Sequence, residues 1–218
     1  MQKAMWVLAA MLLAGMLGTV SAIGAPLHSE NVPMRTFKDA RDLQAWTVFC
    51  EGSGKVECSI DTAQPERIEL TAGNWKEIEA INIRVNRMVK LVTDQEHWDA
   101  PDVWSLAEDG KGDGEDYALL KRRLLVGKGL PRRAMRMTVV IDEAGHGHGV
   151  LTLITDRGDY VLDSKTNAVM PWHHTGYVFI KRERQDKFGW VSLGGVASPI
   201  QYDKKPDPKA AVTTAPRP

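Results

Sequence analysis

The chain has 218 residues, of which 43% are hydrophobic and 26% charged, so it can bury one core of ordinary size and still leave residues for tails. Its 28 basic and 28 acidic side chains give no formal net charge. A balanced charge produces no net field that would attract nucleic acid or an anionic membrane surface. The composition therefore gives no support to a nucleic-acid partner.

An uncharged segment follows Lys3 and runs from Ala4 to Val20. The small residues Ser21 and Ala22 close this segment, which is typical of cleavage by signal peptidase after Ala22. We therefore expect a signal peptide over residues 1–22 and an exported mature protein. The alternative is an uncleaved membrane anchor, because the uncharged segment is close to the shortest length that spans a bilayer, about 17 residues.

Cys50 and Cys58 lie eight positions apart and are the two cysteines of the chain. An oxidising compartment would let them close a small disulfide loop. The alternative is a pair of free thiols in a cytosolic protein, which the signal segment disfavours.

Hydrophobic content divides the exported chain into three parts. Residues 23–36 are expected to form a flexible N-terminal segment, and the polar, irregular pattern starts at Pro26 and continues to Asp42. Residues 37–200 carry the apolar content of one folded domain. Residues 201–218 are expected to be a disordered tail, because four prolines and no large apolar residue follow Asp203.

The first long predicted helix starts at Asn74, which precedes Glu77 by three residues as in a capping box. Apolar residues then recur at helical spacing as far as Val92. Three polar residues within this helix are expected on its solvated face: Asn82, Asn86 and Arg87.

A glycine-rich acidic stretch, residues 108–116, leads into a second predicted helix that ends near Gly127. Asp113 is the expected N-cap of this helix. Glu115 and Asp116 lie in its first turn, where carboxylates suit the positive end of the helix dipole.

Beyond Pro131 the sequence changes to short segments rich in Val, Ile, Thr and Tyr, which indicate strands. The predicted strands cover residues 135–141, 149–155, 160–162, 177–180 and 190–193. Residues 156–158 form a hairpin signal between the second and the third of these strands. Helices followed by an antiparallel sheet define an α+β fold class.

This order of elements can carry cysteine-protease chemistry. A nucleophilic cysteine acts best at a helix N-terminus, where the dipole and free N–H groups lower its pKa, with a histidine base held by a carboxylate. His148 opens one strand of the predicted hairpin and Asp163 follows the other, so the two side chains could face each other across an antiparallel pair.

Several blocks of sequence, in order along the chain, resemble the bacterial transglutaminase-like cysteine peptidases. The blocks are Val85-Asn86-Arg87, Thr93 to Trp98, Gly110 to Leu125, Met137 to Val140, Gly147 to Thr152 and Tyr160 to Asp163. The resemblance implies a core related to papain and to transglutaminases, and a periplasmic location.

The family pattern assigns roles to three positions of this chain. The loop-to-helix block of the family reads Gly-Asp-Cys-Glu-Asp, and this chain has Gly114 at the position of the cysteine. The resemblance makes His148 the base and Asp163 its orienting partner, with Ser164 in place of the usual asparagine. Without a side chain at position 114 no thiolate can attack an acyl carbon, so ordinary turnover should be absent. A natural pseudoenzyme, a single-base change from a cysteine codon and deliberate inactivation are all compatible with Gly114.

The resemblance also implies calcium, with Asp113 and Glu115 at the matching acidic positions. Asp109 and Asp116 add further carboxylates in the same loop, and calcium prefers such oxygen ligands. The alternative is helix capping by Asp113 and dipole compensation by Glu115.

Active relatives hydrolyse peptide bonds, and the best-understood ones cut a surface adhesin and are held by an inner-membrane receptor. The resemblance therefore implies a protein or peptide substrate and a receptor partner. The alternative is a non-catalytic pseudoenzyme that binds a peptide or the receptor.

The remaining histidines and the tryptophans near these motifs are interpreted more simply. His146 lacks further ligands at zinc spacing, and His173 and His174 are expected to be exposed in a loop. Trp98, Trp104 and Trp172 are expected to pack in the core. Trp104 is the best candidate among them for a cleft residue.

Overall fold

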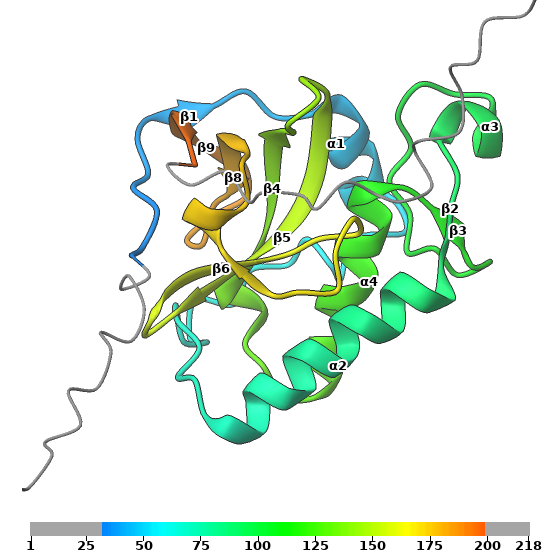
Figure 1. Ribbon diagram of the computed structural model, residues 1–218. Helices are drawn as coiled ribbons and strands as arrows, with labels where there is room; N and C mark the ends of the chain where they lie inside the picture. Colours follow the sequence, from blue (N-terminus) through cyan, green and yellow to red (C-terminus); the bar gives the residue numbers. More distant parts are fainter. Residues whose placement is uncertain (1–31, 199–218) are drawn as a thin grey trace, which may run out of the picture.

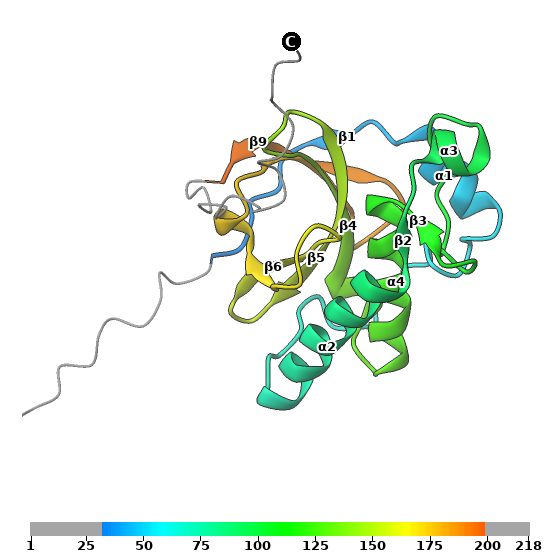
Figure 2. The same ribbon diagram turned by 45° about the vertical axis from the view of Figure 1, so that its right-hand side comes forward.

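The computed structural model describes residues 32–198 and shows an α+β domain (Figure 1). The predicted signal peptide and the predicted C-terminal tail lie outside the described residues. Four helices lie to one side of a strongly curved sheet, as the second view shows (Figure 2). They are α1 (Gln44–Glu51), α2 (Ala72–Met88), α3 (Asp94–Trp98) and α4 (Gly114–Gly127). Between residues 32 and 198, no helix has both the length and the apolar character needed to cross a bilayer.

The large sheet has seven strands in the order β1-β9-β8-β4-β5-β6-β7, and every neighbouring pair is antiparallel. Its strands are β1 (Asp39–Ala40), β4 (Met135–Ile141), β5 (Gly147–Thr155), β6 (Gly158–Leu162), β7 (Met170–Pro171), β8 (Val178–Glu183) and β9 (Trp190–Ala197). The five predicted strands are therefore confirmed, and so is the α+β fold class. Two short strands at the edges, β1 and β7, carried too little apolar pattern to be predicted.

Helix α4 packs against the face of β4 and β5 and forms the centre of the core. Met135 and Leu151 from the sheet and Leu119 and Leu125 from the helix are completely buried. Burying one such side chain contributes about 1.5–3 kcal/mol. This packing fixes where the first turn of α4 lies against β5.

Helix α2 begins three residues earlier than predicted. Its N-cap is Thr71, whose hydroxyl accepts from Asn74 N at 3.2 Å while Asn74 Oδ1 accepts from Thr71 N at 2.8 Å. The predicted capping box from Asn74 to Glu77 is therefore wrong, because Asn74 is the third helical residue and not the cap. The helix also ends at Met88, short of Val92, since the chain turns there into β2 (Lys90–Leu91), which pairs in parallel with β3 (Lys111–Gly112).

Two asparagines of α2 bind the loop that follows β6 and do not face solvent. Asn82 is completely buried, and its Nδ2 donates to the carbonyls of Thr166 and Asn167 at 3.2 and 3.0 Å. Asn86 Nδ2 donates to Thr166 O at 2.8 Å and to Asp163 O at 3.0 Å. The prediction of a solvated face is wrong at both positions, because these amides satisfy loop carbonyls that no strand pairs.

The described part of the expected N-terminal tail is held against the sheet. Met34 is buried and its N donates to Asp159 Oδ2 at 3.0 Å, and β1 pairs with β9. These contacts use mainly backbone groups, so the polar composition of the segment did not reveal them.

The predicted disulfide between Cys50 and Cys58 is present. It anchors the end of α1, and the loop it closes carries Glu57 into the interior. Glu57 is buried, and its carbonyl accepts from Arg122 Nη2 of α4 at 2.9 Å. The disulfide loop therefore fastens α1 to the helix that carries position 114.

Candidate active site

The first turn of α4 meets β5 at Gly114. A Cβ built on Gly114 would lie 2.6 Å from His148 Nδ1 and 2.9 Å from Gly149 O, distances that real Cβ atoms do not tolerate. A Cβ on Gly149 would in turn lie 3.0 Å from Glu115 N. Two glycines therefore allow the helix start and the strand to touch through their backbones.

His148 and Asp163 are in direct contact. The register of β5 and β6 pairs Leu151 with Leu162, which places Asp163 diagonally across from His148. His148 Nε2 lies 2.7 Å from Asp163 Oδ1, so its Nδ1 is the ring nitrogen that faces Gly114. The carboxylate thereby fixes the orientation of the imidazole, the arrangement that a general base requires.

The Asp163 carboxylate is held at both oxygens. Tyr177 donates its hydroxyl to Oδ2 at 2.5 Å, and Lys165 N donates to Oδ1 at 3.1 Å. Burial pushes the pKa of Asp163 upward, but hydrogen bonds from His148 and Tyr177 outweigh it and hold the pKa below its ordinary value. Asp163 is therefore a carboxylate at neutral pH.

Lys121 and Asn86 hold the backbone of the same residue. Lys121 Nζ donates to Asp163 O at 2.9 Å from a completely buried position, and burial lowers the pKa of Lys121 to about 7 although the charge of Asp163 opposes the shift. Sequence reasoning missed this lysine and Tyr177. A signal existed for Lys121, since it follows Gly114 by seven residues and so lies on the same face of α4.

An acidic cluster lies beside the helix start. Oxygen atoms of Asp94, Asp113 and Glu115 lie within 4.8 Å of one another. Asp94 Oδ1 and Asp113 Oδ1 are buried and have no hydrogen-bond partner among the described residues. Asp113 is the N-cap residue of α4 as predicted, but its side chain makes no capping hydrogen bond, so capping does not account for its carboxylate. Asp94, the first residue of α3, was missed as a member because it comes nineteen positions earlier in the chain.

Asp109 and Asp116, the other two acidic residues named from the sequence, do not belong to the triad formed by Asp94, Asp113 and Glu115. Asp109 is exposed and lies 2.8 Å from His97 Nε2. Asp116 is buried beside the triad, and its Oδ1 accepts from Ser105 N at 2.6 Å.

Burial raises the pKa values of these acidic groups, and repulsion between neighbouring carboxylates adds to the shift. Burial, followed by the charge of Asp113 and a hydrogen bond to it, raises the pKa of Glu115 to about 10. Burial also raises the pKa of Asp116 to about 7 and moves the pKa of Asp113 upward. A cation among them would remove this repulsion, and their hard oxygens are the ligands that calcium prefers.

The sequence matches the profile described as bacterial transglutaminase-like cysteine proteinase over residues 37–198. The chain belongs to this family. No curated protein matches it in sequence.

Solved structures of one protein resemble the fold. Calcium-bound LapG from Legionella pneumophila is 21% identical, with a TM-score of 0.48, over 59% of this chain and 75% of that one. A second structure of the same LapG is 23% identical, with a TM-score of 0.48, over 56% of this chain and 70% of that one. An EGTA-treated form is 21% identical, with a TM-score of 0.46, over 55% of this chain and 67% of that one.

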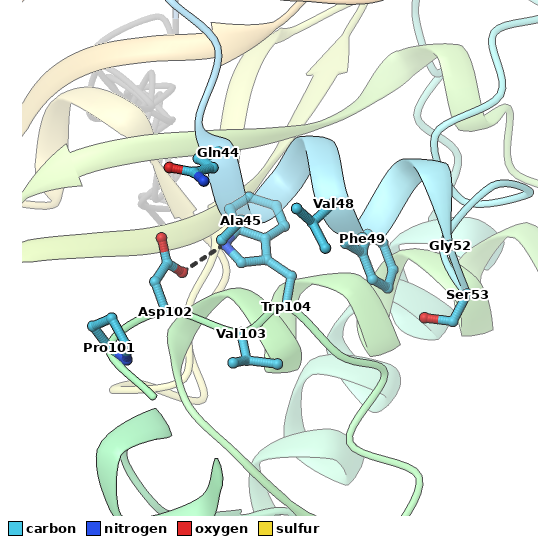
Figure 3. Close-up of a pocket in the computed structure, with 10 residues that line it drawn as sticks. All are labelled: Gln44, Ala45, Val48, Phe49, Gly52, Ser53, Pro101, Asp102, Val103 and Trp104. Carbon is cyan, nitrogen blue, oxygen red and sulfur yellow. Dashed lines mark hydrogen bonds between the residues drawn. The ribbon is translucent and has the colours of Figure 1, made fainter. Parts of the chain in front are cut away.

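In this member of the proteinase family, a groove of about 570 Å³ runs between α1 and residues 101–104 (Figure 3). Trp104 forms part of its wall and donates Nε1 to Asp102 Oδ1 at 3.1 Å. Trp104 is also buried and meets Trp190 edge to face, so it serves both the core and the groove.

Outcomes for the remaining aromatic side chains are mixed. Trp172 is buried as expected, whereas Trp98 is 47% exposed and the core prediction is wrong for it. His173 is buried in a short 3-10 helix, Trp172–His174, so its predicted exposure is wrong, while His146 lies in solvent.

Proposed function

We propose that this chain is an exported, periplasmic member of the cysteine proteinase family that does not hydrolyse peptide bonds and acts by binding. The observation that carries the proposal is Gly114, which stands at the helix start facing the Nδ1 atom of His148. The proposed roles of His148 as base and Asp163 as its orienting partner need a sulfur atom at position 114 to form an acyl-enzyme. Cys50 and Cys58 do not supply one, because they form the disulfide.

The proposed ligand is a protein or peptide segment, in keeping with the peptidase family. A surface adhesin and an inner-membrane receptor are the two candidates that the family resemblance suggests. The groove beside Trp104 supports a binding role, because apolar side chains line it and one of its lining residues, Val103, is hydrogen-bonded to Asp94 of the acidic cluster.

We further propose that Asp94, Asp113 and Glu115 hold a calcium ion. The two buried oxygens without partners and the raised pKa of Glu115 support this assignment. Bound calcium would supply positive charge beside the first turn of α4. Through the ion, Asp94 of α3 would be linked to Asp113 and Glu115 at the start of α4.

Hydrolysis and thiol reactivity test the proposal. The unaltered chain should not cleave protein substrates, in calcium or in chelator. Gly114→Cys should place a thiol against His148 Nδ1, and its pKa, measured from the pH dependence of iodoacetamide labelling, should fall below the ordinary value of about 8.5. The matched control is Gly127→Cys on the same helix, where a Cβ meets nothing within 4 Å and the pKa should be ordinary.

Two outcomes would contradict the proposal. Hydrolysis by the unaltered chain that disappears in His148→Ala would show another nucleophile at the site. An ordinary thiol pKa in Gly114→Cys would remove His148 as the base.

A further inference from the structure

The groove in Figure 3 has one wall that is fixed by covalent and buried contacts. This wall is α1. Cys50 at its end is in the disulfide, and Trp46 Nε1 donates to the buried carboxylate of Glu183 at 2.8 Å. Neither contact involves the acidic cluster.

The opposite wall, residues 101–104, continues directly into Ser105, and carboxylates at the acidic cluster hold two backbone amides of this segment. Val103 N donates to Asp94 Oδ2 at 2.6 Å, and Ser105 N donates to Asp116 Oδ1 at 2.6 Å. Trp104, between these two amides, carries the large apolar side chain of the wall.

The two oxygens of Asp94 therefore face different parts of the molecule, Oδ2 the wall of the groove and Oδ1 the acidic cluster. It is only 4% exposed, and while Oδ2 holds the wall, Oδ1 is buried without a partner beside Asp113 and Glu115. A buried oxygen with no donor is costly unless a cation occupies the space it faces.

We propose that a divalent cation bound by Asp94, Asp113 and Glu115 fixes the segment 101–105, which includes the wall at residues 101–104, and so sets the width of the groove. The inference rests on the proposed calcium site and assigns that site a regulatory effect. Without a cation, the buried oxygens Asp94 Oδ1 and Asp113 Oδ1 have no positive partner among the described residues, so nothing there holds Asp94 at the cluster side and its hold on Val103 is weaker. With a cation, Oδ1 is bound to the metal, and Asp94 is fixed in the position from which its Oδ2 accepts from Val103 N.

Amide hydrogen exchange of the oxidised mature protein tests this proposal, with calcium, magnesium or chelator as the only variable. Calcium binding is measured in parallel by isothermal titration. We expect calcium to slow the exchange of the Val103 and Ser105 amides at least tenfold, while the amides of α1, residues 44–51, keep their rates.

Asp94→Asn keeps an acceptor for Val103 but loses the charge, and should lose the calcium response. The matched control is Asp109→Asn, since Asp109 also accepts from a backbone amide, that of Lys111 at 3.1 Å, but lies outside the triad. This control should respond as the unaltered protein does. If Asp94→Asn does not fold, Glu115→Gln replaces it with the same expectation, because it leaves the Asp94 bond to Val103 intact.

Two results would overturn the inference, and they differ in what else they remove. Calcium that binds in the titration but leaves the Val103 and Ser105 amides unchanged contradicts the inference alone. A titration without binding removes the proposed calcium site together with it.

Discussion

At the scale of single residues, the structure leaves no room for a side chain at position 114 without a shift of its neighbours. Gly114→Ala adds one carbon that would lie 2.6 Å from the His148 ring and 2.9 Å from a backbone oxygen. The ring can rotate, but Gly149 O belongs to β5 and cannot move without its strand. We expect a loss of about 1–3 kcal/mol in the free energy of unfolding, as for overpacked cores.

Urea unfolding measures this loss, with Gly127→Ala as its control. At Gly127 nothing lies within 4 Å of the added carbon, and the same substitution should stabilise the protein by about 0.4–1 kcal/mol. Equal effects at the two positions would mean that α4 and β5 do not touch at Gly114.

The sequence located residues best where a pattern is local. The family resemblance named position 114, His148 and Asp163, which the structure brings together while their roles stay proposals, and the short separation of Cys50 and Cys58 predicted the disulfide. Asp94, Lys121 and Tyr177 were missed because their partners lie far away along the chain and a single polar residue in a helix or strand ordinarily faces solvent.

At the scale of elements, α2 acts as a clamp on the loop that carries Asp163. Asn86→Ala removes donors to the carbonyls of Asp163 and Thr166 and leaves them with fewer partners, so we expect a loss of about 1–3 kcal/mol. Exchange of the amides in residues 163–167 should quicken by the same mechanism. The control on the same helix is Arg87→Ala, whose exposed side chain should contribute less than about 0.5 kcal/mol.

Hydrogen exchange and urea unfolding together show whether Asn86 holds the loop or is only a solvated side chain. If Asn86→Ala were as harmless as Arg87→Ala, the contacts from Asn82, Lys121 and Tyr177 would be sufficient to hold the loop.

Element boundaries show the same limit of sequence reasoning. Strands β4, β5 and β6 were predicted from their enrichment in Val, Ile, Thr and Tyr, the residue types that suit a buried sheet. The start of α2 was wrong because Asn74 and Thr71 both suit a capping box, and only the three-dimensional pairing of their side chains separates the two. The edge strands β1 and β7 have two residues each, too few to show a period.

At the scale of the whole molecule, the acidic cluster should make stability depend on pH and calcium together. Free glutamate titrates near pH 4.3, whereas burial and Asp113 raise the pKa of Glu115 to about 10 in the folded protein. Between these values the folded chain keeps a proton that the unfolded chain has lost. The free energy of unfolding contributed by Glu115 is therefore complete below about pH 4.3 and falls as pH rises.

Lys121 opposes this trend above pH 7, because burial lowers its pKa to about 7 and the unfolded lysine then binds more protons than the folded one.

Comparison with Glu115→Gln isolates the contribution of the cluster, since both proteins contain Lys121. In chelator, we expect the melting temperature of the unaltered protein to fall relative to that of Glu115→Gln as pH rises from 5 to 8. Calcium must displace the proton on Glu115, so its stabilising effect should grow over the same range.

At a calcium concentration 100 times the dissociation constant, the free energy of unfolding rises by about 2.7 kcal/mol. For a chain of this size, at about 2–4 °C per kcal/mol, this raises the melting temperature by roughly 5–10 °C. Magnesium is the ion control and Asp109→Asn the carboxylate control. Parallel melting profiles of the unaltered protein and Glu115→Gln, with no gain from calcium at pH 8, would show that the cluster neither holds the extra proton nor exchanges it for the metal.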